Sequence, residues 1–403
     1  MMMEGSLTLV QGPPGTGKTK TIIETIRLLK KRFQIPHPLL VCTYTNVAVD
    51  NLVGGLVQAG LNPLRVGSEG GVREDLEKWS LQAKMEKHSS WTTLTKLKDK
   101  LTDQRIRLAK LSPREDKSLE VGQIKEHIAA TRSQIRKLRC QMQYEIYCAA
   151  DVVCTTCLTA GAPSFGVLDF PIVFLDEASM CTEPASLIPL MHGCRQLALI
   201  GDHKQLPPII TSAVAQKGGL SRSLFERLMD EKKYPTIMLN TQYRMHPTIS
   251  AFPSKNFYNT ALKDGTVLPS GAAILSPPRS RHLSCRKSLQ TGEIPSVLFI
   301  HHDNYEITID RSKANLKEIS IVMAILEDLL LSNPEMNGKD IGIISPYVAQ
   351  TRRLESTLKY DPGWAKYFER RLGRSRAVEM KNVEVKTVDG FEGREKDVII
   401  FST

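Results

Sequence analysis

Residues 7–20 read LTLVQGPPGTGKTK, and this stretch decides the fold. Its apolar start predicts a buried strand, the glycines from Gly12 to Gly17 predict a loop, and the residues from Lys18 onward predict a helix. The pattern Gly-x-x-x-x-Gly-Lys-Thr between a strand and a helix is typical of a P-loop, in which backbone N–H groups at a helix N-terminus surround phosphates. We therefore expect a site for a nucleotide with magnesium.

The loop supplies most of the expected nucleotide contacts. Glycines let the backbone approach phosphates without a Cβ in the way. Lys18 is expected to reach the β- and γ-phosphates, and the hydroxyl of Thr19 is expected to hold Mg²⁺. The residues expected to cradle the phosphates are Gly12, Pro13, Pro14, Gly15, Thr16, Gly17, Lys18 and Thr19.

Two acidic residues follow a second apolar run, IVFL at residues 172–175. Asp176 would bind Mg²⁺ through water, and Glu177 would orient and deprotonate an attacking water. An Asp-Glu pair at a strand end is also typical of a helix N-cap followed by a first-turn acid. The later strand that ends in Gly201-Asp202 favours the catalytic interpretation, because P-loop, acidic pair and polar strand end follow in that order.

Strand-like and helix-like segments alternate through most of the chain, which predicts an α/β fold with parallel sheets. In the first part, further strands are expected at 38–44, 151–158, 171–178 and 196–202. In the second part, strands are expected at 235–240, 296–302, 340–347, 383–391 and 397–403, helices at 315–331 and 349–359, and a long loop at 269–295. We therefore expect a first domain over residues 1–233 and a second over 234–403.

A long charged segment, residues 69–147, interrupts the first domain. Its apolar residues keep helical spacing on both sides of Ser112-Pro113, which predicts an inserted antiparallel helical hairpin. Between residues 68 and 146 there are 17 Lys and Arg against 12 Asp and Glu, a surplus of 5 positive charges. A solvated helical surface and a nucleic-acid contact explain this surplus equally well.

Composition indicates which binding partners and which cell compartment suit the protein. The 403 residues carry a net charge of +11, which favours an acidic partner and nucleic acid first. The eight cysteines lack disulfide-like spacing, and Cys154 and Cys157 lie in an apolar strand pattern that indicates core residues rather than a zinc site. His301 and His302 have no evident metal partners either. Since no stretch has the length or apolarity of a membrane span, we expect a cytosolic or nuclear protein.

Eight segments follow one another in a characteristic order, namely 12–19, 39–52, 151–161, 173–184, 199–208, 239–259, 344–350 and 385–402. In this joint order they resemble the motifs of the superfamily-1 helicases. The similarity is greatest to the branch that includes the Up-frameshift nonsense-decay RNA helicase, senataxin and the immunoglobulin-mu-binding helicase. It covers nearly the whole chain and implies two RecA-like P-loop NTPase domains.

The resemblance implies roles for further residues around ATP. Gln205 would sense the γ-phosphate and link hydrolysis to the nucleic-acid groove. Tyr243 would stack on the base, Arg244 would reach the γ-phosphate from the second domain, and Glu395 would contact the ribose. An arginine that arrives from a second domain would stabilise the charge of the transferring phosphoryl group.

The resemblance also implies contacts with a nucleic-acid strand. Thr45 and Asn46, at a strand end, would contact phosphates with hydroxyl, amide and backbone donors. Pro346 and Tyr347 would lie near the path of the strand, although Tyr347 after an apolar strand is also typical of a packed aromatic residue. The implied partners are single-stranded RNA or DNA and proteins of RNA metabolism, and we expect a monomer.

Departures from the family pattern leave two functional hypotheses. Relatives usually carry glutamine where this chain has Glu392, and a negative charge near phosphates weakens anion contact unless it is paired or turned away. The chain runs from Met1 to Thr403, so we expect it to lack the family's upstream glutamine motif and β-barrel. We also expect it to lack motif VI, which leaves the second domain incomplete at its C-terminus.

The leading hypothesis is an ATP-dependent helicase or translocase of the 5′-to-3′ branch. The alternative is a nucleotide-gated clamp that binds nucleic acid with little or no turnover.

Overall fold

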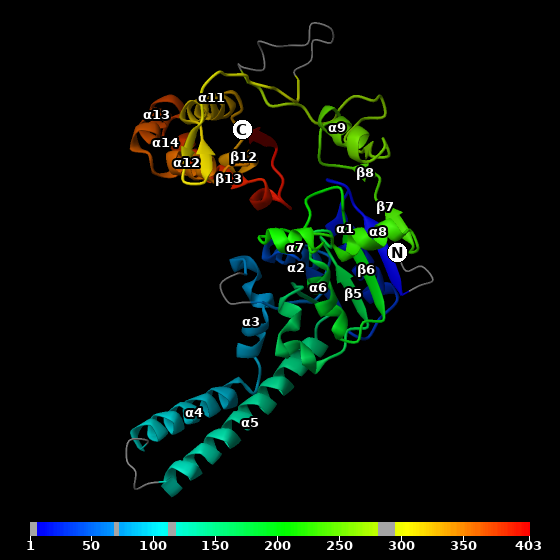
Figure 1. Cartoon of the computed structure of the whole chain (residues 1–403), viewed down its shortest axis with the longest axis vertical. Helices are drawn as coiled ribbons and strands as arrows, with labels where there is room; N and C mark the ends of the chain where they lie inside the picture. The colour runs from blue at the N-terminus through cyan, green and yellow to red at the C-terminus, as the bar shows by residue number, and fades with distance from the viewer. Residues whose placement is uncertain (1–5, 68–71, 112–117, 281–294) are drawn as a thin grey trace. The chain divides into compact units, whose positions relative to one another are not determined.

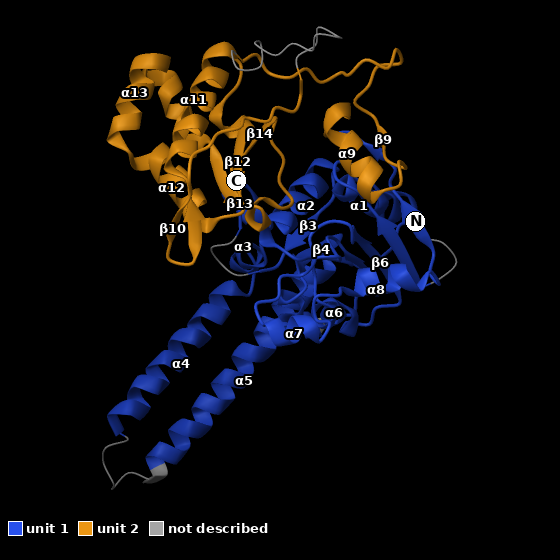
Figure 2. Ribbon diagram, turned by 45° about the horizontal axis from the view of Figure 1, so that its top comes forward, with its two compact units in different colours: residues 1–243 blue, residues 244–403 orange. Residues whose placement is uncertain are grey.

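The computed structural model describes residues 6–67, 72–111, 118–280 and 295–403. The chain divides into two compact units, residues 1–243 and 244–403 (Figure 2). The first unit is built on one seven-stranded sheet in the order β3-β4-β2-β5-β6-β1-β7, in which all neighbouring strands run parallel. The strands are β1 (Leu7–Gln11), β2 (Leu39–Thr43), β3 (Pro63–Arg65), β4 (Val152–Thr156), β5 (Ile172–Leu175), β6 (Gln196–Gly201) and β7 (Thr236–Met238).

The strands of this sheet read as continuous apolar runs because both faces are covered (Figure 1). Alternate residues enter two separate cores: Leu9 lies in the core on one face, whereas Val10 lies in the core on the other. The second face is covered by α1 (Lys18–Arg27) and α2 (Asn46–Gln58). Shorter helices complete the unit, namely α6 (Glu183–Leu187), α7 (Ala213–Lys217) and α8 (Leu224–Glu231).

The predicted helical insertion is present. It consists of α3 (Leu81–Glu86), α4 (Trp91–Leu111) and α5 (Ser118–Cys148), and Figure 1 shows α4 and α5 side by side as a hairpin. At the base of the hairpin, Leu94 and Met142 belong to the core of the first face. The predicted break at Ser112-Pro113 lies outside the described residues.

Strand β7 joins the first sheet, although the sequence-based boundary at residues 233 and 234 assigned it to the second domain. It pairs parallel with β1, with Val10 opposite Ile237. Residues 240–243, including the short strand β8 (Thr241–Gln242), follow in the same compact unit. The boundary between the units therefore falls ten residues later than the predicted domain boundary, because the pairing partner of a short strand is not visible in its own sequence.

The second unit contains a three-stranded parallel sheet in the order β13-β12-β14. Its core lies between this sheet and the helices α11 (Leu316–Ser332), α12 (Val348–Tyr360) and α13 (Pro362–Leu372). Helices α11 and α12 confirm the helices predicted at 315–331 and 349–359. The elements are α9 (Pro247–Phe257), β9 (Lys263–Asp264), β10 (Ile307–Ile309), β11 (Ser312–Ala314), α11 (Leu316–Ser332), β12 (Ile341–Ser345), α12 (Val348–Tyr360), α13 (Pro362–Leu372), α14 (Arg374–Ala377), β13 (Glu384–Thr387) and β14 (Val398–Phe401).

The strand predicted at residues 296–302 is wrong. These residues form neither strand nor helix, and the side chain of Phe299 is 79% exposed. The continuous apolar run at residues 297–300 satisfies the local preference for a strand. A strand also needs a neighbour for its backbone groups, and these residues have none in the described part of the chain. Among the described helices, none is long and apolar enough to cross a membrane.

Candidate nucleotide site and nucleic-acid contacts

The predicted P-loop connects the end of β1 to the first turn of α1. Gly15 and Gly17 adopt positive φ angles of 75° and 82°, which glycine accepts at low cost. A Cβ on Gly12 would lie 2.2 Å from Cγ of Lys18, so only glycine lets this lysine fold back along the loop. Thr16 closes the turn by donating its hydroxyl to the carbonyl of Pro13 at 2.7 Å.

Lys18 and Glu177 meet in this site. The ammonium of Lys18 donates to the carbonyl of Gly12 at 3.2 Å and lies 3.4 Å from a carboxylate oxygen of Glu177. Glu177 has a φ of 51°, an uncommon conformation for a residue with a Cβ. Both side chains are largely buried, at 12% and 23% exposure, and therefore share a site of reduced solvent access.

Asp176 lies at the carboxyl end of β5 and is 3% exposed. Burial, and then the neighbouring charge of Glu177, raise the pKa of this carboxyl to about 7, against the lowering effects of Lys18 and of the backbone N–H of Glu177. That N–H donates to Oδ1 at 3.0 Å. A buried carboxyl with a raised pKa at a strand end is suited to exchange its proton for a cation.

Oxygen ligands of this kind fit Mg²⁺. Magnesium is usually held by one or two protein oxygens together with phosphate oxygens and waters. Thr19 in the first turn of α1 and Asp176 at the end of β5 are the residues that would hold it. Among the described residues, no group of three or more His, Cys, Asp or Glu side chains could hold a metal ion.

Gln205 is positioned by Asp202, a residue to which sequence reasoning gave no role. The side-chain amide of Gln205 donates to Oδ2 of Asp202 at 2.7 Å, and Gln11 at the end of β1 donates to Oδ1 at 3.2 Å. The backbone N–H of Asp202 donates to the hydroxyl of Ser179 at 3.0 Å. Asp202 is 1% exposed, so it joins the ends of β1 and β6 to the segment that follows Asp176. Its position directly after the apolar run of β6 was the only sequence signal.

Tyr243 lies at the P-loop through its backbone. Its N–H donates to the carbonyl of Gly15 at 2.8 Å, while its side chain is 67% exposed. An exposed ring whose backbone is tied to the loop is available for stacking.

Arg244 and Glu395, the two nucleotide contacts implied for the second unit, pair with each other. The guanidinium of Arg244 donates through Nε to a carboxylate oxygen of Glu395. Both side chains are more than a third exposed, so this pair contributes little to stability. Glu392 is half-buried at the end of the short helical turn at Asp389–Phe391.

Thr45 and Asn46 begin α2 where β2 ends. Thr45 is the N-cap, and its hydroxyl oxygen accepts from the N–H of Ala48 at 3.2 Å. Asn46 is exposed, and its side-chain oxygen accepts from Nη2 of Arg65 at 2.9 Å. Sequence reasoning missed Arg65, a wholly buried side chain that also donates to Asp50 at 2.9 Å.

Arg65 determines which atoms Asn46 presents to solvent. A guanidinium has only donors, so the oxygen of the amide must face it. The NH₂ group of this exposed residue makes no hydrogen bond within the described residues, so it can donate to an acceptor such as a phosphate oxygen. The structure therefore leaves a donor at the position where the resemblance expects a strand contact.

In the second unit, Pro346 and Tyr347 lie between β12 and α12. Pro346 is exposed and Tyr347, the N-cap of α12, is half-buried. Four arginines lie between residues 370 and 376, and two of them have structural partners. Arg376 donates to four backbone carbonyls, including that of Leu330 at 2.8 Å, and Arg371 pairs with Glu327 at 2.6 Å.

The parallel sheet, the P-loop and the acidic residues at the ends of β5 and β6 together define a P-loop NTPase of RecA-like architecture. Residues 1–213 match the family described as AAA domain, and residues 220–403 match a second family with the same description. The chain belongs to this AAA-domain family, and within it to the Up-frameshift-like branch of the superfamily-1 helicases.

Several curated relatives resemble the chain along its whole length. It is 33% identical to a regulator of nonsense transcripts 1 homolog of Neurospora crassa, over 100% of this chain and 33% of the relative. It is 33% identical to the ATP-dependent helicase upf1 of Schizosaccharomyces pombe, over 98% of this chain and 39% of that protein. It is 30% identical to the helicase sen1 of the same organism, over 98% of this chain and 26% of that protein. The chain thus spans about a quarter to two fifths of these relatives.

Proposed function

We propose that this protein hydrolyses ATP with Mg²⁺ and uses the cycle to move 5′-to-3′ along single-stranded RNA or DNA, as a helicase or translocase. The observation that carries the proposal is the convergence of Lys18, Glu177 and Gln205 at the carboxyl ends of three adjacent strands. In parallel α/β sheets, ligands bind at this edge. The names of the relatives, two of which are helicases, support the same activity.

Each residue of the site has its own role in the proposed reaction. The P-loop N–H groups and Lys18 hold the phosphates, and Thr19 and Asp176 hold Mg²⁺, which neutralises charge on the phosphate oxygens. Glu177, released from Lys18 when phosphate takes its place, orients the attacking water and accepts its proton. Gln205, fixed by Asp202, contacts the same water or the γ-phosphate.

Further residues complete the proposal. Tyr243 stacks on the adenine, Glu395 contacts the ribose, and Arg244 stabilises the transferring phosphoryl group. Thr45, Asn46, Pro346 and Tyr347 contact the strand. Protein partners in RNA metabolism and a cytosolic or nuclear location accompany this function.

The test is ATP hydrolysis with and without single-stranded RNA and DNA, in the native chain and in Glu177→Gln. We expect turnover stimulated by the strand, and a loss of about a hundredfold or more in the variant because the general base is gone. Lys18→Ala should abolish nucleotide binding, whereas Lys20→Ala, an exposed lysine on the same helix, should not. Strand binding that responds to an ATP analogue in the absence of turnover would support the clamp and overturn the helicase.

A further inference from the structure

The helical hairpin packs through one row of residues on each helix. In α4 the inward residues are Leu94, Leu97, Leu101, Gln104 and Leu108, and in α5 they are Ile124, Ile128, Thr131, Ile135 and Leu138; all ten are buried or half-buried. The residue after each of them is exposed. Each such residue is rotated by about 100° from the inward direction, onto one flank of its helix.

The two flanks form a single face of the hairpin. Both helices are right-handed and they run antiparallel, so a rotation of about 100° from the inward direction leads to the same side of the pair in α4 and in α5. We name this surface the hairpin basic face. Its ten residues are Thr95, Lys98, Thr102, Arg105, Ala109, Lys125, Ala129, Arg132, Arg136 and Arg139.

Six of these ten residues are Lys or Arg, and none is Asp or Glu. None of the six cations pairs with a carboxylate within the described residues. The acidic residues lie elsewhere on the hairpin: Glu120 pairs with Arg107 at 3.1 Å, and Glu145 lies 3.0 Å from His88. The charges of the hairpin are therefore sorted by face.

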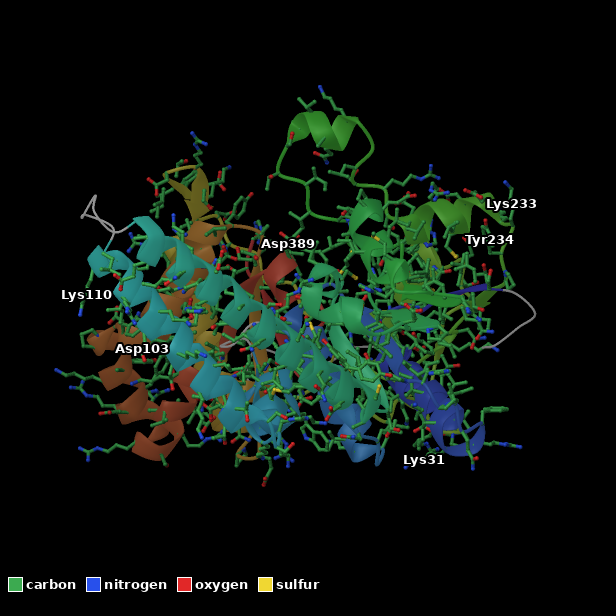
Figure 3. The ribbon with its side chains drawn as sticks, turned by 90° about the horizontal axis from the view of Figure 1, so that it is seen from below. Lys31, Asp103, Lys110, Lys233, Tyr234 and Asp389 are labelled. Atoms are coloured by element: carbon green, nitrogen blue, oxygen red, sulfur yellow. The ribbon has the colours of Figure 1, made fainter. Side chains whose placement is uncertain are left out.

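The opposite flank shows the contrast. It is made by the residues that precede the inward residues. Its four cations, Lys96, Lys100, Arg107 and Lys137, are accompanied by Asp103, and Arg107 pairs with Glu120. Figure 3 shows Lys110, near the distal end of α4, pointing away from the sheet. A solvated helix surface usually mixes both signs of charge, as this flank does.

Grouping the cations on one face destabilises helix α5. Arg132 and Arg136 are four residues apart, and Arg136 and Arg139 are three apart, which are the spacings at which side chains on a helix are neighbours. Like charges at these spacings destabilise a helix by about 0.2–0.5 kcal/mol per pair. An acidic ligand along the face would remove this repulsion.

From this arrangement we infer that the hairpin basic face binds the phosphate backbone of a nucleic acid, outside the strand contacts at Thr45 and Asn46. The inference rests on the proposed function, which supplies a nucleic acid to the same unit. From Lys125 to Arg139 the row extends about 21 Å along α5, which matches an extended polyanion better than a single anion. The face carries no exposed aromatic residue for base stacking, so it reads the backbone and not the sequence.

The test compares two triple variants of the full chain. Arg132→Gln, Arg136→Gln and Arg139→Gln remove three charges from the basic face, whereas Lys96→Gln, Lys100→Gln and Lys137→Gln remove three charges from the opposite flank. Affinity for oligo(U) and oligo(dT), short and long, is measured over a range of salt concentrations. Nucleotide affinity and melting temperature of each variant show that the fold is retained.

We expect the arginine variant to bind long oligonucleotides about tenfold more weakly at low salt, and the slope of log affinity against log salt to fall by about 2, because three phosphate contacts are lost. The lysine control should keep the native slope. Equal losses in both variants, or no loss in either, overturn the inference and leave the proposed function standing. An arginine variant that loses affinity for polyglutamate but keeps the native affinity for the oligonucleotides has the same consequence. If the native chain binds no oligonucleotide, both fall.

Discussion

At the scale of single residues, the proton on Asp176 connects the fold to metal binding. Its pKa is raised from 3.8 to about 7 by burial and by Glu177. Between these two values the folded chain holds a proton that the unfolded chain has lost. The free energy of unfolding of the nucleotide-free protein therefore falls as pH rises through that window.

The same shift predicts how magnesium binding depends on pH. Mg²⁺ needs the ionised carboxylate, so protons compete with it below pH 7. We expect the affinity for Mg-ATP to fall by up to about tenfold for each pH unit below 7. Titration of a fluorescent ATP analogue at several pH values, with Mg²⁺ or with EDTA, measures this. Asp176→Asn should remove both the magnesium effect and its pH dependence, and a pH dependence that survives in this variant would assign it to another group.

Arg65 offers a second prediction for one side chain. If Arg65 acts on the nucleic acid by orienting Asn46, Asn46→Ala should weaken strand binding by about tenfold, the value of one hydrogen bond to a charged group. Arg65→Lys, which loses the planar fork, should do the same. In the Asn46→Ala background Arg65→Lys should then cost nothing more in strand affinity.

The double-mutant cycle separates orientation from stability. Loss of a buried partner of Asp50 lowers the melting temperature in either background, whereas strand affinity should respond only while Asn46 is present. Asn46→Asp keeps an acceptor for Arg65 but presents a carboxylate to phosphate, so it should bind the strand more weakly than Asn46→Ala. Additive effects of Arg65→Lys and Asn46→Ala on strand affinity would contradict the orienting role.

At the scale of elements, α1 and α2 pack closely, and two neighbouring glycines of α2 differ in the space that surrounds them. A Cβ on Gly55 would lie 2.3 Å from Cδ1 of Ile23, whereas a Cβ on Gly54 meets nothing closer than 3.8 Å. Both glycines are inside α2. The helix that carries Thr45 and Asn46 at its start therefore rests against the helix of the P-loop through one glycine.

Alanine at these two positions should have different effects on stability. Gly54→Ala should stabilise the protein by up to about 1 kcal/mol, because alanine is the better helix former. Gly55→Ala should be less stable than Gly54→Ala by about 1–3 kcal/mol, because Ile23 must leave its preferred position. Chemical denaturation of both variants measures the difference, and equal stability would show that Ile23 moves at no cost.

The elements that the sequence predicted are those specified by neighbouring residues. The strand, loop and helix around Gly12 follow from a local pattern, as do Asp176 at its strand end and the hairpin spacing of α4 and α5. The sheet that β7 joins and the unpaired state of residues 296–302 depend on distant strands. The contacts of Arg65 and Asp202 depend on distant side chains, so their roles could not be read from the sequence.

At the scale of the whole molecule, the buried cores divide in the same way as the units. Both cores of the first sheet are drawn from residues of 1–243, and the third core is drawn from residues of 244–403. The P-loop, Asp176, Glu177 and Gln205 all belong to the first unit. Nucleotide binding should therefore stabilise the first unit more than the second, whose proposed nucleotide contacts are Arg244 and Glu395 alone.

Heating should accordingly unfold the chain in two transitions, and the nucleotide should raise the transition of the first unit more than that of the second. A ligand at a hundred times its dissociation constant stabilises its own unit by about 2.7 kcal/mol. Trp79 and Trp91 lie in the first unit and Trp364 in the second, so Trp364→Phe leaves fluorescence that reports on the first unit alone. In that variant Mg-ATP should raise the observed transition, and Lys18→Ala should abolish the rise. A calorimetric scan of the native chain in which Mg-ATP raises both transitions together would show that the two cores unfold as one.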